Sequence, residues 1–473
     1  MTPHLFLSYF LYIHDIPLQY WYIDALRIVL RVLIPLFAVL LAVPPLVWYE
    51  RRLLGWMQQR QGPNRVGPFG LLQTIADGVK LLFKEDMNPL NVDKTLFILA
   101  PIVFLIPTLV TPVVIPWGPS RNWGAGAPGV SVGVLYLLAW GSLAVYGIVL
   151  AGWSSNNKYS LLGGLRSSAQ MISYELAMGL AILTVVLMTS SLGLQDVVDN
   201  QGYFNLPIPL MGEHGPLALP AWNIFKFFPM GFIATLLYVI SMLAETNRAP
   251  FDLPEAETEL VAGYHTEYTS MKFATFFMGE YGNMIVTSAI CATLFFGGYN
   301  APLQCLNALP PECGSSWSVK LIDSFIPAIW LTLKVFAGIY FFIWIRATLP
   351  RLRYDMLMKF GWQGLLPIAL LNLLLVAVSI TLGYGVGLAA WIVFFGILLV
   401  VFAQSARSII FTTNTRRDSS IRLYSSAQPF SAVPQNPGVG AQTLPPDAAV
   451  GGFDIPTTDR EADEMYAALS KKG

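Results

Sequence analysis

Nine stretches of apolar residues divide the chain into segments of about 20 residues, the length that a helix needs to cross a membrane. They are 28–48, 95–117, 131–153, 169–191, 225–245, 277–298, 326–346, 363–383 and 388–411. The last two are separated only by a short turn with Gly383, Gly385 and Gly387, so a single helix there is the main alternative. The pattern predicts an all-α polytopic membrane protein with about nine transmembrane helices.

The polar segment after the first stretch has a different pattern. Residues 61–70, QGPNRVGPFG, are rich in the glycine and proline that turns require. Apolar side chains then recur at helical spacing, at Phe69, Leu72, Ile75, Val79 and Leu82. Polar side chains fall on the opposite side, which predicts an amphipathic helix lying in the membrane interface. Asp77 on that polar side either pairs with Lys80 or has a functional role, and both interpretations stay open.

Composition supports the membrane class. Hydrophobic residues make up 55% of the 473, charged residues 12%, and the mean hydropathy is +0.57. A soluble globular protein carries about 25% charged residues. The zero net charge argues against a nucleic-acid partner.

The end of the chain differs in composition from the rest. Residues 412–455 are rich in Ser, Pro, Gly, Gln and Ala, and such a segment cannot form a core. We therefore expect a transmembrane domain over 1–411 and a flexible tail over 412–473. Apolar residues within 457–471 have helical spacing, which favours a short terminal helix that docks on another subunit of a complex, with an entirely disordered end as the alternative.

Basic residues in the loops predict the orientation. The loops 49–94, 152–168, 246–276 and 346–362 together hold fifteen Lys and Arg, whereas the alternate loops hold only Arg121 and Lys320. Because basic loops stay in the cytoplasm, we expect the N-terminus outside and the tail inside. The pattern fits the plasma membrane of a bacterial-type cell.

Carboxylates cluster in and around the loop after the fifth stretch. They are Glu245, Asp252, Glu255, Glu257, Glu259, Glu267 and Glu280, and only Arg248 and Lys272 oppose them. Carboxylates near a membrane are costly unless they are paired, hydrated or protonated, so this cluster is a candidate proton-exchange site. The alternative is that the acids after Pro254 only complement a helix dipole.

A few more ionisable residues lie within or beside the apolar stretches. Glu50 ends the first stretch, Glu175 follows Tyr174 in the fourth, and Lys334 is in the middle of the seventh. Each has a structural ion pair as its alternative role.

The cysteines and histidines show no metal-binding pattern. The three cysteines lack the paired spacing of an iron–sulfur or zinc site, and the four histidines form no array. We expect no metal, flavin or cluster to be bound by this chain. Cys305 and Cys313 lie in a loop on the predicted outer side, where a disulfide is favoured over two free thiols, and Cys291 is expected to be a free packing residue.

Three motifs together resemble one family. They are GPNRVGP at 62–68, ETNRAPFDLPEAETELVAGY at 245–264 and RATLPRLRYD at 346–355. All three are similar to the H subunit of respiratory complex I, the proton-pumping NADH:quinone oxidoreductase, known in mitochondria as NADH dehydrogenase subunit 1. The resemblance covers roughly residues 20–385, and the ninth stretch and the tail exceed the eight-helix mitochondrial pattern.

The resemblance implies a role between quinone and proton transfer. It implies that the protein forms much of the quinone chamber, beside the cluster-carrying peripheral subunits and the other membrane-arm subunits, and is not active alone. Quinone-channel candidates are Glu50, Arg51, Arg60, Asp77, Arg248, Arg346 and Arg351. Proton-coupling candidates are Glu175, Glu245, Asp252, Glu255, Glu257, Glu280 and Lys334.

Two other functions remain open at this point. A homologous subunit of a membrane-bound hydrogenase or another donor-linked dehydrogenase would carry the same motifs. A cation/proton antiporter would also place charges in helices, but such transporters show inverted repeats with broken helices, and no matching halves are found in this sequence. The quinone type, ubiquinone or menaquinone, is not encoded in any motif that we recognise.

Overall fold

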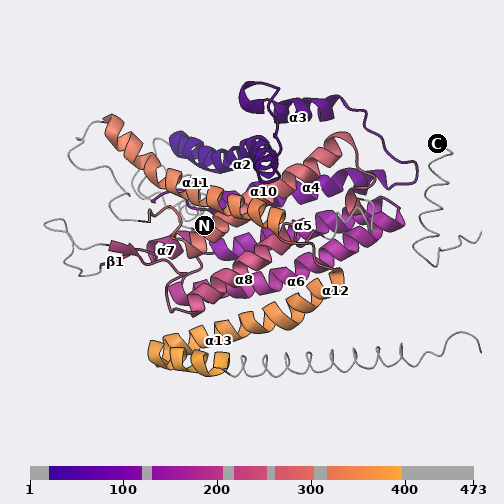
Figure 1. The fold of residues 1–473 in the computed structure, drawn as a ribbon. Helices are drawn as coiled ribbons and strands as arrows, with labels where there is room; N and C mark the ends of the chain where they lie inside the picture. The colour runs from indigo at the N-terminus through magenta and orange to yellow at the C-terminus, as the bar shows by residue number, and fades with distance from the viewer. Residues whose placement is uncertain (1–20, 120–129, 206–217, 253–261, 303–316, 397–473) are drawn as a thin grey trace, which may run out of the picture. The chain divides into compact units, whose positions relative to one another are not determined.

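The computed structural model describes residues 21–119, 130–205, 218–252, 262–302 and 317–396. All of them belong to one unit of the chain, residues 1–396. The long helices are α2 (Trp21–Met57), α4 (Lys94–Val110), α5 (Gly133–Ser154), α6 (Lys158–Thr189), α8 (Met230–Glu245), α10 (Ser270–Phe295), α11 (Trp317–Thr348) and α13 (Leu366–Leu382). Figure 1 shows them as a bundle of neighbouring helices.

Six helices of the described part are long and apolar enough to cross a membrane. They are Val29–Met57, Lys94–Val114, Gly133–Ser154, Lys158–Thr189, Ile326–Thr348 and Tyr354–Leu382. The predicted class, a helical multi-pass membrane protein, is therefore confirmed, whereas the count of nine stays a prediction. α8 has only 16 residues, and the short helix Tyr384–Gly396 ends where the described residues end. α10 is long, but the polar residues Glu280 and Asn283 lower its hydropathy.

Several helices begin or end well outside the predicted stretches. α2 reaches Met57 and α6 begins at Lys158, although the apolar runs cover only 28–48 and 169–191. Helical hydrogen bonding continues past the hydrocarbon-length segment because polar side chains do not interrupt it. Glu175, expected one turn into its helix, is therefore near the middle of α6.

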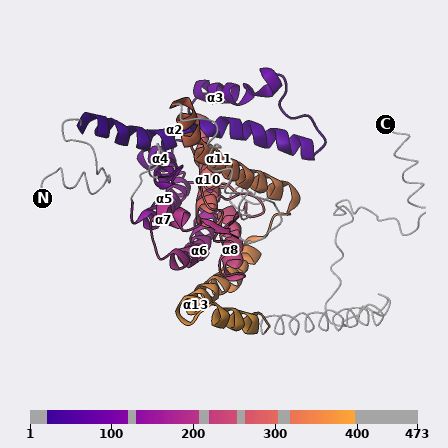
Figure 2. The same cartoon turned by 90° about the vertical axis from the view of Figure 1, so that its left-hand side faces the viewer.

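The helices are arranged around α6 and α10. α5 packs between α4 and α6, while α8 and α13 both pack on α6. α10 contacts α4, α11 and α2, which brings the first and seventh predicted stretches together (Figures 1 and 2). We call the end of the bundle with the C-terminus of α2 and the N-terminus of α10 the α3 end. The opposite end, which carries a short two-stranded β-ribbon, is called the ribbon end.

Glycines allow two of these close approaches. A Cβ at Gly147 of α5 would lie 2.7 Å from the backbone nitrogen of Phe104 in α4. A Cβ at Gly163 of α6 would lie 2.7 Å from the Cα of Gly263. Small residues at helix contacts are typical of membrane bundles. The second contact holds the short 3₁₀ helix η4 (Gly263–His265) against α6.

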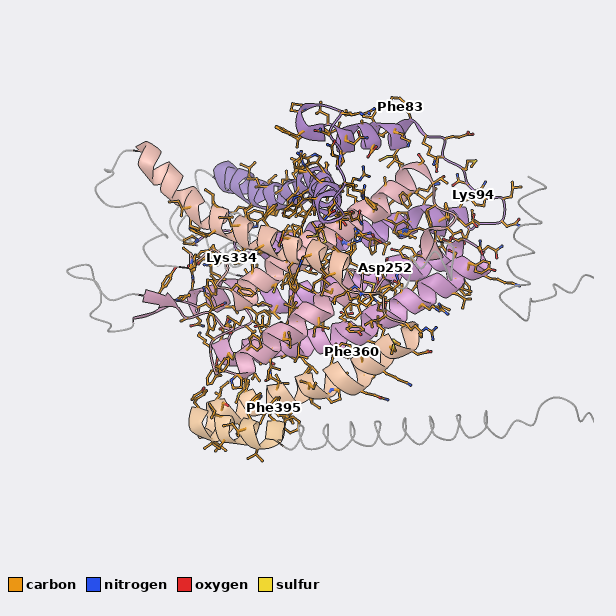
Figure 3. The ribbon with its side chains drawn as sticks, in the orientation of Figure 1. Phe83, Lys94, Asp252, Lys334, Phe360 and Phe395 are labelled. Carbon is orange, nitrogen blue, oxygen red and sulfur yellow. The ribbon has the colours of Figure 1, made fainter. Side chains whose placement is uncertain are left out.

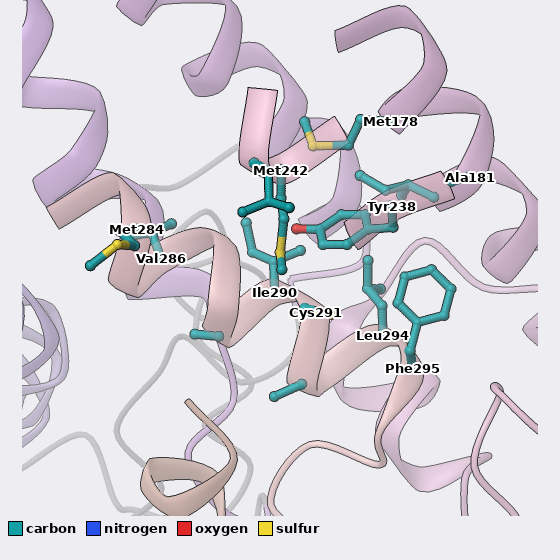
Figure 4. Packing of buried hydrophobic residues seen from close by; sticks show 14 of the residues in the cluster. Met178, Ala181, Tyr238, Met242, Met284, Val286, Ile290, Cys291, Leu294 and Phe295 are labelled. Atoms are coloured by element: carbon teal, nitrogen blue, oxygen red, sulfur yellow. The ribbon is translucent and has the colours of Figure 1, made fainter. Parts of the chain in front are cut away.

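The core contains methionine, aliphatic and aromatic side chains, with few polar groups. Tyr238 is surrounded by Met178, Met242, Ile290 and Phe295 in Figure 4, and these residues belong to the main apolar cluster. The Tyr238 hydroxyl donates to the carbonyl of Thr287 at 3.1 Å, so the buried phenol is satisfied. Cys291 is a buried free thiol, as expected.

The ribbon end contains the short helix α7 (Leu194–Asp199) and the only strands among the described residues. β1 (Tyr203–Asn205) pairs antiparallel with β2 (Ala218–Pro220), with Tyr203 opposite Pro220. We did not predict this ribbon, because three-residue strands leave too little alternation to detect.

The segment 61–83 folds as a turn followed by a helix. The 3₁₀ helix η2 (Pro68–Gly70) precedes α3 (Gln73–Phe83), so Phe69 and Leu72 lie outside the helix that we expected them to begin. The side chains of Ile75, Val79 and Leu82 are exposed.

The last long helix has a short helix before it. α12 (Tyr354–Lys359) leads through a π-helical turn, Phe360–Leu365, into α13.

Some predictions fall outside the described residues. These are the tail over 412–473 with its helix, the Cys305–Cys313 disulfide, and the positions of Glu255, Glu257 and Glu259.

Candidate functional site

Glu50 is the centre of a charged cluster at the α3 end of the bundle. Its side chain is 3% exposed, so its negative charge needs partners from the protein. Arg346 of α11 and the hydroxyl of Tyr281 in α10 both donate to the Glu50 carboxylate. An Arg248 nitrogen lies 3.7 Å from Glu50 Oε1. Three helices and the loop after α8 therefore meet at one carboxylate.

Arg248 connects Glu50 to a second buried carboxylate, Glu280. The Arg248 Nη2 atom lies 3.9 Å from Glu280 Oε2, and the guanidinium stacks 4.3 Å from the centre of the Tyr281 ring. Glu280 also accepts a hydrogen bond of 2.9 Å from the Tyr264 hydroxyl. A change of charge at either carboxylate therefore changes the electrostatic energy of the same guanidinium.

His265 borders this cluster. Its Nε2 atom lies 3.7 Å from Glu280 Oε1, and its ring packs against Tyr264, Phe273 and Phe276. Burial lowers the pKa of His265 to about 4, so the imidazole is neutral at pH 7. Neither ring nitrogen has a hydrogen-bond partner among the described residues.

A second acidic pair, Glu175 and Glu245, lines a small cavity between α4, α5, α6, α8 and α10. The cavity has a volume of about 40 Å³. That is enough space for one or two water molecules. The Ser142 hydroxyl donates to Glu175, whereas Glu245 Oε2 has no hydrogen-bond partner among the described residues. Thr287 and Asn283 add polar groups to the cavity wall.

The segment 245–252 joins the two acidic groups. Glu245 ends α8 beside the small cavity, and Arg248 reaches the Glu50 cluster three residues later. Asp252 then pairs with Arg351 at 2.9 Å, and the backbone N–H of Leu352 donates to the Pro250 carbonyl. Two of the three motifs therefore contact each other directly.

Arg51 and Arg52 point to the turn and helix that follow α2. Arg51 pairs with Asp77 of α3 at 2.5 Å, and Gln73 also donates to Asp77. The pairing of Asp77 with Lys80, one of the two interpretations left open, is therefore wrong. Arg52 stacks on Trp48 and Phe69 and donates to the Phe69 carbonyl at 3.0 Å. These contacts hold the turn at 67–70 over the end of α2.

An apolar cavity of about 500 Å³ lies beside the Glu50 cluster. Its walls come from α2, α10, α11 and the segment 112–117, and Leu71 contributes from the turn before α3. Tyr49, the neighbour of Glu50, is among the lining residues. Its volume and apolar lining are those of a site for an apolar small molecule.

Two predicted site residues lie away from these groups. Arg60 is exposed after α2 and donates to Gln58 at 2.6 Å. Lys334 belongs to α11, and its side chain reaches the C-terminus of α10. There its ammonium donates to the carbonyls of Phe296, Gly298 and Asn300. Figure 3 shows Lys334 toward the ribbon end, far along the bundle from Asp252.

Sequence reasoning missed five residues of the site: Arg52, Gln170, Tyr264, His265 and Tyr281. Tyr264 is the last residue of the acidic motif, His265 follows it, and Tyr281 follows Glu280, so proximity was an available signal for these three. A buried glutamine on a helix that also carries Ser167, Ser168 and Ser173 gave no such signal. Among the described residues no group of three or more His, Cys, Asp and Glu is placed to hold a metal.

Comparisons with known proteins identify the family of the chain. The family model described as NADH dehydrogenase matches residues 30–377. The H subunit numbered 2 of the NADH-quinone oxidoreductase of Koribacter versatilis is 45% identical over 370 residues, covering 75% of this chain and 96% of the relative. The H subunit of the Rickettsia typhi NADH-quinone oxidoreductase is 48% identical over 363 residues, covering 76% and 96%. The chain therefore belongs to the family of NADH-quinone oxidoreductase H subunits, which are membrane subunits of respiratory complex I.

Proposed function

We propose that this chain forms the quinone chamber of a proton-translocating NADH:quinone oxidoreductase and passes the charge of quinone reduction to buried carboxylates. The observation that carries the proposal is the position of Arg248, which lies within 4 Å of both Glu50 and Glu280. The apolar cavity beside Glu50 has the lining that an isoprenoid tail requires.

The chemistry follows from charge. A quinone that receives electrons gains negative charge, and nearby cations stabilise it. Arg51, Arg248, Arg346 and Arg351 are the candidates for this role, with Asp77 holding Arg51 in place. When an arginine turns toward the reduced quinone, the carboxylates that it leaves bind protons more readily.

The carboxylates offer a route away from the chamber. Glu280 and Glu50 share Arg248, and Glu245 with Glu175 surrounds a cavity with room for water. The intervening segment 245–252 carries both Glu245 and Arg248 on one short stretch of backbone. A proton taken up by such a cluster belongs to the group and not to one residue. Glu255 and Glu257 are proposed to extend this group.

The membrane arrangement belongs to the same proposal. We infer nine membrane-crossing helices, with α8, α10 and the helix that starts at Tyr384 added to the six long apolar ones. The fifteen basic residues of the loops 49–94, 152–168, 246–276 and 346–362 support a cytoplasmic location for the α3 end. The exposed side chains of Ile75, Val79 and Leu82 support a position of α3 in the interface, with these side chains toward lipid. Quinone, lipids, the other membrane-arm subunits and the cluster-carrying peripheral subunits are the proposed partners, and electrons reach quinone from those peripheral subunits.

The test neutralises single carboxylates without changing their shape. Glu245→Gln and Glu280→Gln complexes should assemble normally but lose quinone reductase activity and proton translocation together. Electron transfer from NADH to an artificial acceptor upstream of quinone should stay near wild type, because no redox cofactor site is assigned to this chain.

Glu267→Gln is the matched control. Glu267 lies in the same loop, but among the described residues it accepts only from Asn157, away from both acidic groups, so this variant should keep full activity. If the acids only complement helix dipoles, each Gln variant would lose about 0.3–1 kcal/mol of stability and keep its turnover. Full quinone reduction with full pumping in both Gln variants would refute the coupling role.

A further inference from the structure

Gln170 of α6 binds the backbone on both sides of the segment that joins the two acidic groups. Its side chain is fully buried, at 0% exposure. Its Nε2 atom donates to the carbonyl of Ala244 and to the carbonyl of Phe251, both at 2.8 Å. These carbonyls lie one residue before Glu245 and three residues after Arg248. One amide group therefore ties the two ends of the segment together.

The backbone of this segment needs such a tie. α8 ends at Glu245, and the Ala244 carbonyl in its last turn accepts from the backbone N–H groups of Thr246 and Asn247 as well as from Gln170. Among the described residues, the Phe251 carbonyl accepts only from Gln170. Asn247 then has a φ of 50°, in the left-handed region, and the chain reverses direction. Every residue of the reversal except Ala249 is buried, and a buried carbonyl without a donor is costly. Gln170, on a helix outside the reversal, supplies a donor to a carbonyl on each side of it.

The position of the reversal determines where two charged side chains lie. Glu245, at the start of the reversal, lines the small cavity. Arg248, in the middle of the reversal, reaches Glu50 and Glu280. Glu175, the other acid of the cavity, is on α6 itself, five residues after Gln170. The same helix that carries one acid of the pair thus holds the backbone that carries the other.

We propose that Gln170 is a positioning residue, which sets the placement of Glu245 relative to Glu175 and of Arg248 relative to Glu50 and Glu280. The proposal rests on the proton-coupling function proposed above. Gln170 exchanges no proton and contacts no substrate. It acts by keeping the two acidic groups at a fixed separation. That separation matters because a displacement of about 1 Å in a site can lower the rate by up to about 100-fold.

The first test is Gln170→Met, which keeps the side-chain length and removes both N–H donors. The assembled complex should oxidise NADH with the upstream artificial acceptor at the wild-type rate. Its quinone reductase kcat should fall by about tenfold or more because Glu245 and Arg248 are displaced, with the quinone KM changed less than about twofold because the apolar cavity stays intact.

Gln201→Met is the matched control. Gln201 is also fully buried, and its Nε2 donates to the carbonyls of Val197 and Thr293 at the ribbon end. This variant should lower the amount of assembled complex and leave kcat per complex unchanged. If Gln170→Met also keeps its kcat per complex, the positioning role is wrong.

Gln170→Glu gives a readout that a merely structural role would not move. The introduced carboxyl has no donor when ionised and one O–H donor when protonated. Quinone reductase kcat, relative to wild type at the same pH, should therefore recover as the pH is lowered. This variant also decides the matter if Gln170→Met fails to assemble, because a pH-independent ratio would overturn the proposal.

The outcomes separate this proposal from the function on which it rests. Full activity of Glu245→Gln and Glu280→Gln together with a low kcat of Gln170→Met would reject coupling through these acids and keep Gln170 as the residue that positions Arg248. Inactive Glu→Gln variants with a fully active Gln170→Met would keep the coupling role and reject Gln170.

Discussion

At the scale of single residues, the site consists of buried charges that share partners. Glu50 has two arginines and a tyrosine, and Arg248 has two carboxylates. Removing one member of a buried ion pair costs about 3–5 kcal/mol because the other charge stays behind. Substitutions here therefore mix stability with function, and informative variants preserve shape or lie at the exposed edge of the cluster.

Arg51 lies at such an edge. Arg51→Ala should raise the apparent KM for quinone and leave the carboxylates of the buried cluster in place, since the side chain is half-exposed and pairs only with Asp77. Steady-state kinetics with a short-chain quinone measure this. Arg60→Ala is the comparison, because among the described residues the Arg60 side chain donates only to Gln58. An equal rise in KM for both variants would mean that general positive charge, and not a contact at Arg51, binds the substrate.

Because His265 is buried and neutral, we expect the stability of the folded protein to fall in acid. The pKa of His265 is about 4 in the folded chain and about 6.5 when unfolded, so only the unfolded chain takes up the proton between these values. Stability is fully present above pH 6.5 and falls as the pH drops toward 4, by about 2 kcal/mol at pH 5. His265→Asn lacks this titration. Its temperature of half-inactivation should fall less than that of wild type between about pH 7.5 and pH 5, and parallel losses would contradict the assignment.

At the scale of elements, helix ends decide where charged groups lie. Lys334 was expected on a proton path, yet it donates to three carbonyls just after α10 and lies 4.9 Å from the Trp222 ring. A cation at a helix C-terminus is stabilised by the exposed carbonyls and the helix dipole. This geometry favours a cap for α10, the helix that carries Glu280 and Tyr281.

The two roles of Lys334 predict different phenotypes. As a cap, Lys334→Met should lower the yield and thermal stability of the complex, since each buried carbonyl left without a donor costs about 1–3 kcal/mol, and pumping per complex should stay normal. Lys226→Met is the control, because Lys226 donates to only one carbonyl, that of Asn200. Normal stability with lost pumping would instead support the proton path.

At the scale of the whole molecule, the family match covers residues 30–377 and leaves the end of the chain unassigned. Truncation after Thr415 should weaken retention of the peripheral arm, because we expect a helix at 457–471 to dock on a cytoplasmic subunit. Co-purification of peripheral subunits with the truncated and full-length proteins measures this. Unchanged assembly and activity would end the docking proposal.

Much of the site was predictable because its charges interrupt apolar runs. Glu50, Glu175, Glu245 and Glu280 stand out in segments that otherwise suit lipid, and the physical cost of such residues marks them as candidate functional residues. Tyr281, Tyr264 and Gln170 were not predictable in this way. Buried tyrosine and glutamine are common where a hydrogen bond is available, and only the fold shows which acceptors they reach.

The sequence by itself determined the class of the protein, the positions of most of its helices and the residues that carry charge. These depend on local hydrophobicity and on motifs, which need no long-range contact. Only the tertiary structure decided which charges meet: Glu50 and Arg346 are 296 residues apart and pair directly, whereas Lys334 lies away from the acids that it was grouped with. Pairing depends on the packing of α2, α10 and α11 around the buried groups, and no spacing along the chain encodes that packing.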